Sequence, residues 1–436
     1  LMFTKKNIYP WYVLAIFTLA YMVSFIDRQV LSLLIEPIKQ DLNISDTQVS
    51  LLIGFAFSIF YVTMAIPIAR MADKRNRVNI IAIGIFFWSL MTALCGFTKN
   101  YWQLFVTRVG VGVGEASLTP SVYSLIPDYF PREKLGKAVG IYMMGMSLGS
   151  GLALILGGII LKLLSGVEEI NLPLIGSLKP WQLTFLIVGL PGILLALIVK
   201  LSIKEPLRKN VFETQDKNAS NEKILSFLKN NKKTLASIVV AYSFGGMAFF
   251  AFLSWIPEHL RRTFDWDISN AGLVFGSLLA TIGSIGAVSG GKFHDLIYKK
   301  GYKDAPLRCA MIVFLILFPV MAITPIIPNS NITVVMLGVF SFVLFFQQAM
   351  SPIAIQMITP NHLRAQVVAI YFFVATFFSI GIGPSIVAIF TDFLFQDESK
   401  LNLSISLTSL ICLPVSILSL YLGLKPYKRS YLKVRN

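Results

Sequence analysis

The sequence predicts an all-α membrane protein with twelve transmembrane helices arranged as two pseudo-symmetric six-helix bundles. Of its 436 residues, 55% are hydrophobic and only 14% are charged, whereas a soluble domain averages about a quarter charged. The apolar residues gather into runs long enough to cross a bilayer. Lysine and arginine concentrate in alternate connections between these runs. The composition therefore excludes an ordinary cytosolic enzyme.

Hydropathy places the spans in order along the chain, and their length decides their secondary structure. Only helices or closed barrels can cross lipid, because every backbone amide needs an internal hydrogen-bond partner. The runs are about twice as long as a barrel strand and lack strict alternation of polar and apolar residues. We therefore expect helices over 11–35, 48–72, 78–98, 101–126, 136–163, 181–203, 236–257, 269–297, 307–327, 332–358, 363–392 and 403–424.

The positive charge of the chain, formally +16, is distributed unevenly between the two sides of these spans. The termini and the even-to-odd connections hold most of the lysines and arginines, and the opposite loops hold seven. Positive-inside reasoning predicts that both termini lie in the cytoplasm, most simply of a bacterial inner membrane. The excess charge then faces anionic lipid headgroups, which removes the main support for nucleic-acid binding.

Two matched halves are predicted on either side of a polar segment. Residues 1–203 form the expected N-terminal bundle, 204–235 a cytoplasmic linker, and 236–436 the C-terminal bundle. Several residues recur in the same order in both halves at similar offsets, as a duplicated transporter-type bundle requires. These pairs include Pro120 with Pro352, Pro127 with Pro360, and Ile141-Tyr142 with Ile370-Tyr371.

Motifs in the first half carry a family resemblance that extends over the whole chain. The stretch 69–77, between the second and third predicted spans, resembles the G-x-x-x-D-[RK]-x-G-[RK] signature of the major facilitator superfamily. It keeps Asp73, Lys74 and Arg77 but lacks both glycines. The run Phe25-Ile-Asp-Arg28 and the run 108–117 (RVGVGVGEAS) resemble the spinster-like transporters within that superfamily. The resemblance implies the twelve-helix fold and a transport function.

Four ionisable residues fall well inside the first-half spans: Asp27, Arg28, Arg108 and Glu115. A charge near the middle of a bilayer costs about 3 kcal/mol or more, so each needs a functional or structural reason. Arg108 and Glu115 are seven residues apart and share a helix face. We expect all four residues around one central cavity.

A proton-coupling role is one interpretation of this cluster, and helix packing is the other. Burial favours the neutral form of a carboxyl group and a nearby cation favours the charged form. Asp27 and Glu115 could therefore exchange protons as Arg28 and Arg108 move, while the arginines bind a carboxylate or phosphate. The spinster resemblance implies these roles for Asp27, Arg28 and Glu115. Alternatively, the charges pair only to fix the helices.

The remaining candidate residues lie outside this cluster. Gln347 and Tyr371 could donate neutral hydrogen bonds to a substrate, or could equally bond neighbouring helices. The resemblance implies that Asp73 and Arg77 form a cytoplasmic gate, and a solvated charge run is the alternative. At the outer end of the seventh span, Glu258, His259, Arg261 and Arg262 are expected to form a solvated rim more often than a gate.

Together these observations predict a proton-coupled secondary transporter, in contact with membrane lipids, rather than an enzyme. The family resemblance implies a monomer. The spinster resemblance implies an amphiphilic anionic substrate such as a lysophospholipid or a sphingoid phosphate. The alternatives are a small organic anion symporter and, with less support, a drug efflux transporter or a polytopic membrane enzyme. The proton gradient supplies the energy, and neither a cofactor nor a metal site is expected.

Overall fold

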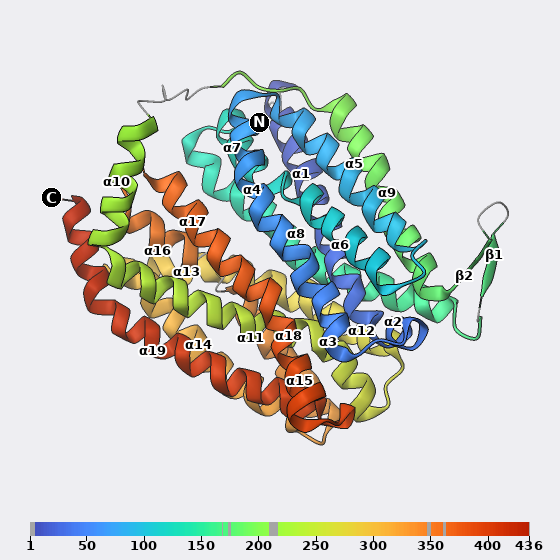
Figure 1. The fold of residues 1–436 in the computed structure, drawn as a ribbon. Helices are drawn as coiled ribbons and strands as arrows, with labels where there is room; N and C mark the ends of the chain where they lie inside the picture. Colours follow the sequence, from blue (N-terminus) through green and yellow to red (C-terminus); the bar gives the residue numbers. More distant parts are fainter. Residues whose placement is uncertain are drawn as a thin grey trace.

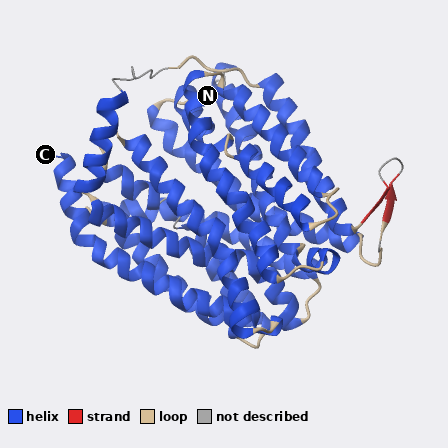
Figure 2. Ribbon diagram, viewed as in Figure 1, coloured by secondary structure: helices blue, strands red, loops and turns tan. Residues whose placement is uncertain are grey.

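The computed structural model is almost entirely helical, as Figure 2 shows. It describes residues 5–167, 169–172, 176–208, 217–346, 350–360 and 363–435. Figure 1 shows two groups of helices side by side: α1 to α9 in blue to green, and α11 to α19 in green to red. The large indole side chains of Trp88, Trp181 and Trp255 are fully buried in this packing. The predicted fold class is confirmed.

The first group holds nine α-helices and two short turns of other helix types. A small antiparallel hairpin, β1 (Ile170–Leu172) with β2 (Gly176–Leu178), projects from it (Figure 1). The helical elements are α1 (Lys5–Gln29), η1 (Val30–Leu33), α2 (Ile35–Leu42), α3 (Asp46–Ser50), η2 (Leu51–Phe55), α4 (Ala56–Lys74), α5 (Arg77–Cys95), α6 (Tyr101–Glu115), α7 (Leu118–Tyr129), α8 (Arg132–Leu163) and α9 (Pro180–Ser202).

The second group follows α10 (Lys217–Asn230), a helix within the predicted linker. Three of its short elements, η3, η5 and η6, are π-helical turns within longer helices. The elements are α11 (Lys232–Phe264), α12 (Ile268–Leu278), η3 (Leu279–Gly283), α13 (Ser284–Lys299), α14 (Ala305–Ile323), η4 (Thr324–Ile326), α15 (Ser330–Phe346), α16 (Met350–Ile358), α17 (Arg364–Thr376), η5 (Phe377–Ile382), α18 (Gly383–Ile389), η6 (Phe390–Phe395), η7 (Glu398–Lys400) and α19 (Leu401–Arg435).

Ten helices in the described part of the chain are long and apolar enough to cross a membrane. The predicted fourth span is divided into α6 and α7, and the predicted tenth span contains α15 and α16, on either side of residues 347–349, which are outside the described residues. A proline excludes the carbonyl four residues before it from the helix. Pro120 therefore ends regular helix at Ala116, just after Glu115, and its repeat partner Pro352 occupies the same place in α16. An interrupted helix marks the binding region of many transporters.

The two groups meet closely where α8 packs against α12. A Cβ atom placed on Gly151 would lie 2.5 Å from the carbonyl oxygen of Gly276, and one on Gly276 would lie 2.6 Å from that of Gly151. No larger side chain fits at this crossing, so the glycines are what allow the two backbones to approach. A second approach joins the π-turn η2 to the π-turn η5, where Gly54 faces Gly381.

Both termini lie at the same end of the helices; Figure 1 marks the N-terminus near the top and the C-terminus at the left. We call this end the proximal face. At the other end lie α2, α3 and the connection from α11 to α12, toward the lower right (Figure 1). We call that end the distal face.

Candidate functional site

The first feature of the candidate site is an ion pair between α1 and the end of α6. The Nη2 atom of Arg28 lies 2.5 Å from Oε2 of Glu115, and its Nε donates to the same oxygen at 2.5 Å. The Ser24 hydroxyl donates a third hydrogen bond to that oxygen at 2.7 Å. The Glu115 side chain is fully buried, while that of Arg28 keeps 13% of its surface exposed. Arg28 is therefore the accessible side of an otherwise enclosed pair.

Aromatic rings surround the guanidinium group of Arg28 on its remaining sides. Its Cζ lies 4.8 Å from the ring centroid of Phe25, 4.5 Å from that of Phe57 and 4.8 Å from that of Tyr61. A cation over an aromatic face is stabilised without being neutralised. The rings therefore hold the guanidinium group in place whether or not Glu115 is charged.

Arg108 serves a different purpose, because it bonds to backbone rather than to carboxylates. Its Nη1 donates to the carbonyl oxygen of Asp27 at 3.2 Å and its Nε to that of Leu52 at 3.4 Å. The glycines that flank it keep α6 thin; a Cβ on Gly112 would run into the backbone of Phe57. Arg108 thus fastens α6 to α1 and η2 at the depth where the other charges lie.

The Asp27 carboxyl group is fully buried beside Trp88 and Thr92 of α5. Among the described residues, neither of its oxygens makes a hydrogen bond of acceptable geometry, and the Trp88 indole and Thr92 hydroxyl are likewise unbonded. Buried polar groups are nearly always bonded to protein or to ordered water. The site therefore holds a fully buried carboxyl group next to groups that can donate to it.

The structure brings the four predicted charges together, but not with the partners that the sequence suggests. Glu115 pairs with Arg28 and not with Arg108, although Arg108 shares its helix. Arg108 donates to the backbone carbonyl oxygen of Asp27 and not to its carboxylate. All four groups lie inside the first helix group, where Asp27, Arg108 and Glu115 are buried and Arg28 keeps part of its surface exposed. The central cavity around them stays a prediction.

The other two predicted substrate contacts lie in the second group. Gln347 is outside the described residues. Tyr371 is buried in α17, where its ring meets Tyr242 of α11 edge to face at 6.2 Å between centroids. This position is compatible with helix packing as much as with substrate binding, and the role predicted for Tyr371 stays a prediction.

Of the two residues predicted to form the cytoplasmic gate, Asp73 and Arg77, the structure describes the side chain of Arg77. Asp73 belongs to α4, and its side chain is outside the described residues. Arg77, at the start of α5, is almost completely buried; its Nη1 lies 2.7 Å from Asp128 of α7 and its Nε 2.6 Å from Glu205. Glu205 also accepts from the backbone N–H groups of Arg77 and Val78 at the helix start. Arg77 is thus a buried junction of α5, α7 and the segment after α9, and not a member of a solvated run.

We expect Arg77→Ala to lower the free energy of unfolding by about 3 kcal/mol, because it removes a buried cation that pairs with the carboxylates of Asp128 and Glu205. Thermal unfolding of the purified protein in detergent measures this change. Arg75→Ala is the matched control, since Arg75 is exposed at the same helix junction. An equal effect of the two substitutions would contradict the buried junction.

Comparison with known proteins identifies the family. A family model described as the Major Facilitator Superfamily matches residues 17–384. The chain belongs to the Major Facilitator Superfamily. Within it the chain is spinster-like: among solved structures, a bacterial homologue of the human lysosomal transporter Spinster, inward-facing and unoccupied, superposes with a TM-score of 0.76. That chain is 25% identical, and 98% of each chain is covered.

The names of relatives of this chain point to different transported substrates. An MFS-type efflux pump of Mycolicibacterium smegmatis is 26% identical over 390 residues, covering 89% of this chain and 86% of the relative. A probable L-galactonate transporter of Escherichia coli is 23% identical, with 86% and 81% covered. The sphingosine-1-phosphate transporter of Danio rerio is 27% identical, with 69% and 60% covered. The relatives are transporters and not enzymes, and the chain is a membrane transporter of this superfamily.

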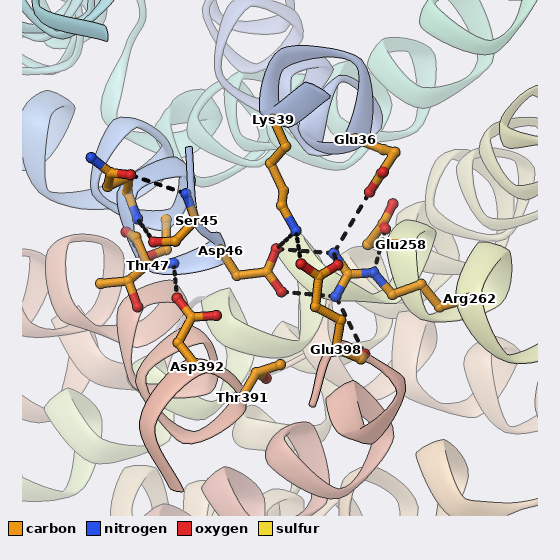
Figure 3. Close-up of polar contacts among 12 residues, drawn as sticks. Glu36, Lys39, Ser45, Asp46, Thr47, Glu258, Arg262, Thr391, Asp392 and Glu398 are labelled. Atoms are coloured by element: carbon orange, nitrogen blue, oxygen red, sulfur yellow. Dashed lines mark hydrogen bonds and ion pairs between the residues drawn. The ribbon is translucent and has the colours of Figure 1, made fainter. Parts of the chain in front are cut away.

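A cluster of charged residues at the distal face is the main feature that sequence reasoning missed. Figure 3 shows Lys39 and Arg262 converging on the carboxylate of Asp46, with Glu36, Glu258 and Glu398 around them. The Lys39 Nζ lies 2.6 Å from Asp46, and the Arg262 guanidinium group bonds both Asp46 oxygens at 2.8 and 2.9 Å. We call these residues, with Arg261, the distal ion network.

The distal ion network corrects the expectation of a solvated rim at the end of α11. Glu258 is only 1% exposed, His259 is fully buried, and the Arg262 side chain is only 7% exposed. The sequence placed Glu258, His259, Arg261 and Arg262 at a helix end, where exposure is the usual outcome. The signal that could have revealed the network is the set of charges at facing loops, Glu36, Lys39 and Asp46 in one half and Glu398 in the other.

Proposed function

We propose that the chain is a proton-coupled secondary active transporter of an amphiphilic anion, working by alternating access. In this proposal the helix group α1–α9 and the helix group α11–α19, which begins at Lys232, rock against each other. The observation that carries the proposal is the Arg28–Glu115 pair, in which a partly exposed cation covers a buried carboxylate. Such a pair links the binding of an anion to the charge state of a carboxyl group.

The coupling follows from competition for one guanidinium group. A substrate phosphate or carboxylate that binds Arg28 in bidentate fashion replaces Glu115 as its partner. Glu115 is then a buried carboxylate without a cation, a state that costs several kcal/mol and that proton uptake relieves. Anion binding therefore draws a proton to Glu115, and release of the anion expels it.

Asp27 is the second proposed proton site. Among the described residues its carboxylate oxygens make no hydrogen bond, and it lies one residue from Arg28, so any movement of α1 that displaces Arg28 also changes the surroundings of Asp27. The hydrogen bond from Arg108 to the Asp27 carbonyl oxygen links α6 to α1, so we propose that the two helices move together. We propose that Arg108 positions the site and contributes positive potential to the bound anion.

The proposed substrate is a lysophospholipid or a sphingoid phosphate, which joins one anionic head to one acyl or alkyl chain. The sphingosine-1-phosphate transporter among the relatives supports this class, as do the aromatic rings around Arg28. The second candidate is a small organic anion, which the galactonate-type relative supports and for which Arg28 alone suffices. In both cases we propose that the termini are cytoplasmic, in a bacterial inner membrane, and that the monomer carries out transport.

One uptake assay separates the two substrate classes. Proteoliposomes with an imposed pH gradient take up a labelled lysophospholipid, and unlabelled competitors are added in turn. We expect a sphingoid phosphate to reduce the uptake at least about tenfold at concentrations at which a dicarboxylate has no effect. Competition by the dicarboxylate alone would favour the organic anion symporter, and uptake that ignores the pH gradient would remove proton coupling.

A further inference from the structure

The distal ion network holds the two helix groups together, and every one of its members also has a partner in its own group. In the described part of the chain, the ion pairs that join the two groups all lie in this network: Arg261 with Glu36, Arg262 with Glu36 and with Asp46, and Lys39 with Glu398. These contacts close the distal face, and they must break if that face is to open.

Partners within the first group remain when those contacts break. Lys39 and Asp46 are both in the first group and lie 2.6 Å apart. Glu36 accepts a hydrogen bond from Gln40, one turn along α2, at 2.8 Å. Lys39, Asp46 and Glu36 therefore each keep a partner in the first group when their contacts with the second group break.

The second group has the same arrangement. Glu258 accepts from Arg261 at 2.7 Å and from Arg262 at 2.5 Å, all three on α11. Glu398 lies 3.6 Å from Arg262. When the groups separate, both arginines therefore keep a carboxylate beside them.

These partners within each group matter because the charged side chains are buried. Asp46 and Glu258 are at most 1% exposed, and Lys39 and Arg262 are 7% exposed. A buried charge that loses its only partner strongly destabilises a protein. If each buried charge had a single partner, in the other group, separating the groups would therefore be costly. In the distal ion network, each charge that loses a partner in the other group keeps a partner in its own group.

We infer that the distal ion network is a self-compensating latch, in which carboxylates of the two groups compete for the same cations and the balance between them sets how readily the distal face opens. Within the described residues, Glu36 makes ion pairs only across the interface, so it favours the closed state. Among the same residues, Glu258 makes ion pairs only within its own group, so it favours the open state by retaining the arginines. Both carboxylates contact Arg261 and Arg262, and yet they act in opposite directions.

The two matched substitutions Glu36→Gln and Glu258→Gln test the latch. Spin labels on cysteines introduced at Lys99, in the loop before α6, and at Asn331, at the start of α15, report the separation of the groups in nanodiscs, because both residues are exposed at the distal face. The three native cysteines are buried. We expect Glu36→Gln to raise the ratio of open to closed protein about fivefold, and Glu258→Gln to lower it by a similar factor.

Two further variants complete the experiment. Asp267→Asn removes an exposed distal carboxylate outside the network and should leave the ratio unchanged. Gln40→Ala, an exposed substitution that preserves folding, removes the own-group partner of Glu36 and should favour the closed state about twofold. If Glu258→Gln does not fold, Gln40→Ala decides. Opening by Glu258→Gln or by Gln40→Ala, or ratios equal to that of Asp267→Asn, would overturn the latch.

Discussion

Glu115→Gln should abolish uptake driven by a pH gradient while leaving the protein folded. The amide keeps the shape of the side chain and can still accept from Ser24 and Arg28, but it cannot exchange a proton. Without that exchange, substrate binding no longer changes the protonation of the site. We expect pH-driven uptake in proteoliposomes to fall at least about a hundredfold, as removal of a coupling group requires.

A second assay on the same variant distinguishes lost coupling from lost binding. Exchange of labelled for unlabelled substrate at equal pH needs binding and movement but no net proton transfer. Glu115→Gln should retain this exchange, because Arg28 remains available to the anion, and Asp267→Asn should behave as the unsubstituted protein in both assays. Full pH-driven uptake by Glu115→Gln would show that the proton does not use this carboxyl group.

Arg28→Ala should be the most destabilising substitution in the candidate site, and Glu115→Gln should reverse most of its effect. Removing the guanidinium group leaves Glu115 buried beside the hydroxyl group of Ser24 alone, and breaking a buried pair in this way costs about 3–5 kcal/mol. The double variant has no unpaired charge. Thermal unfolding in detergent of the two single variants and the double variant measures the coupling between the residues.

The stability of these variants should depend on pH in a direction that the proposed pairing determines. An unpaired carboxyl group is costly only when it is charged, so the loss of stability in Arg28→Ala should grow as the pH rises. The double variant, which cannot be charged at this position, should show no such growth. Additive effects of the two substitutions, or a destabilisation that does not vary with pH, would mean that Arg28 acts through packing against Phe25, Phe57 and Tyr61 alone.

Much of the fold could be predicted from the sequence because lipid leaves few alternatives. Long apolar runs must form helices, and the lysines and arginines between them predict their direction. The division after Glu115 could not be predicted from hydropathy, which runs through it without interruption. Pro120, three residues into α7, is the sequence signal for that division.

The candidate site was predictable in its members and not in its pairing. Mid-span charges stand out in an apolar sequence, so Asp27, Arg28, Arg108 and Glu115 could be found by inspection. Their partners depend on the rotation and relative height of α1 and α6, which close contacts such as that of Gly112 with Phe57 determine. The distal ion network was missed for the opposite reason, because charges in short loops are ordinary and only the tertiary structure buries them.

The most direct measurement of the central claim counts protons when substrate binds. Calorimetric titration of the detergent-solubilised protein with a lysophospholipid, repeated in buffers of different ionisation enthalpy, gives the number of protons taken up with the anion. The account predicts net proton uptake on binding to the unsubstituted protein and a clear reduction in Glu115→Gln. Binding without proton uptake, or the same uptake in both proteins, would contradict it.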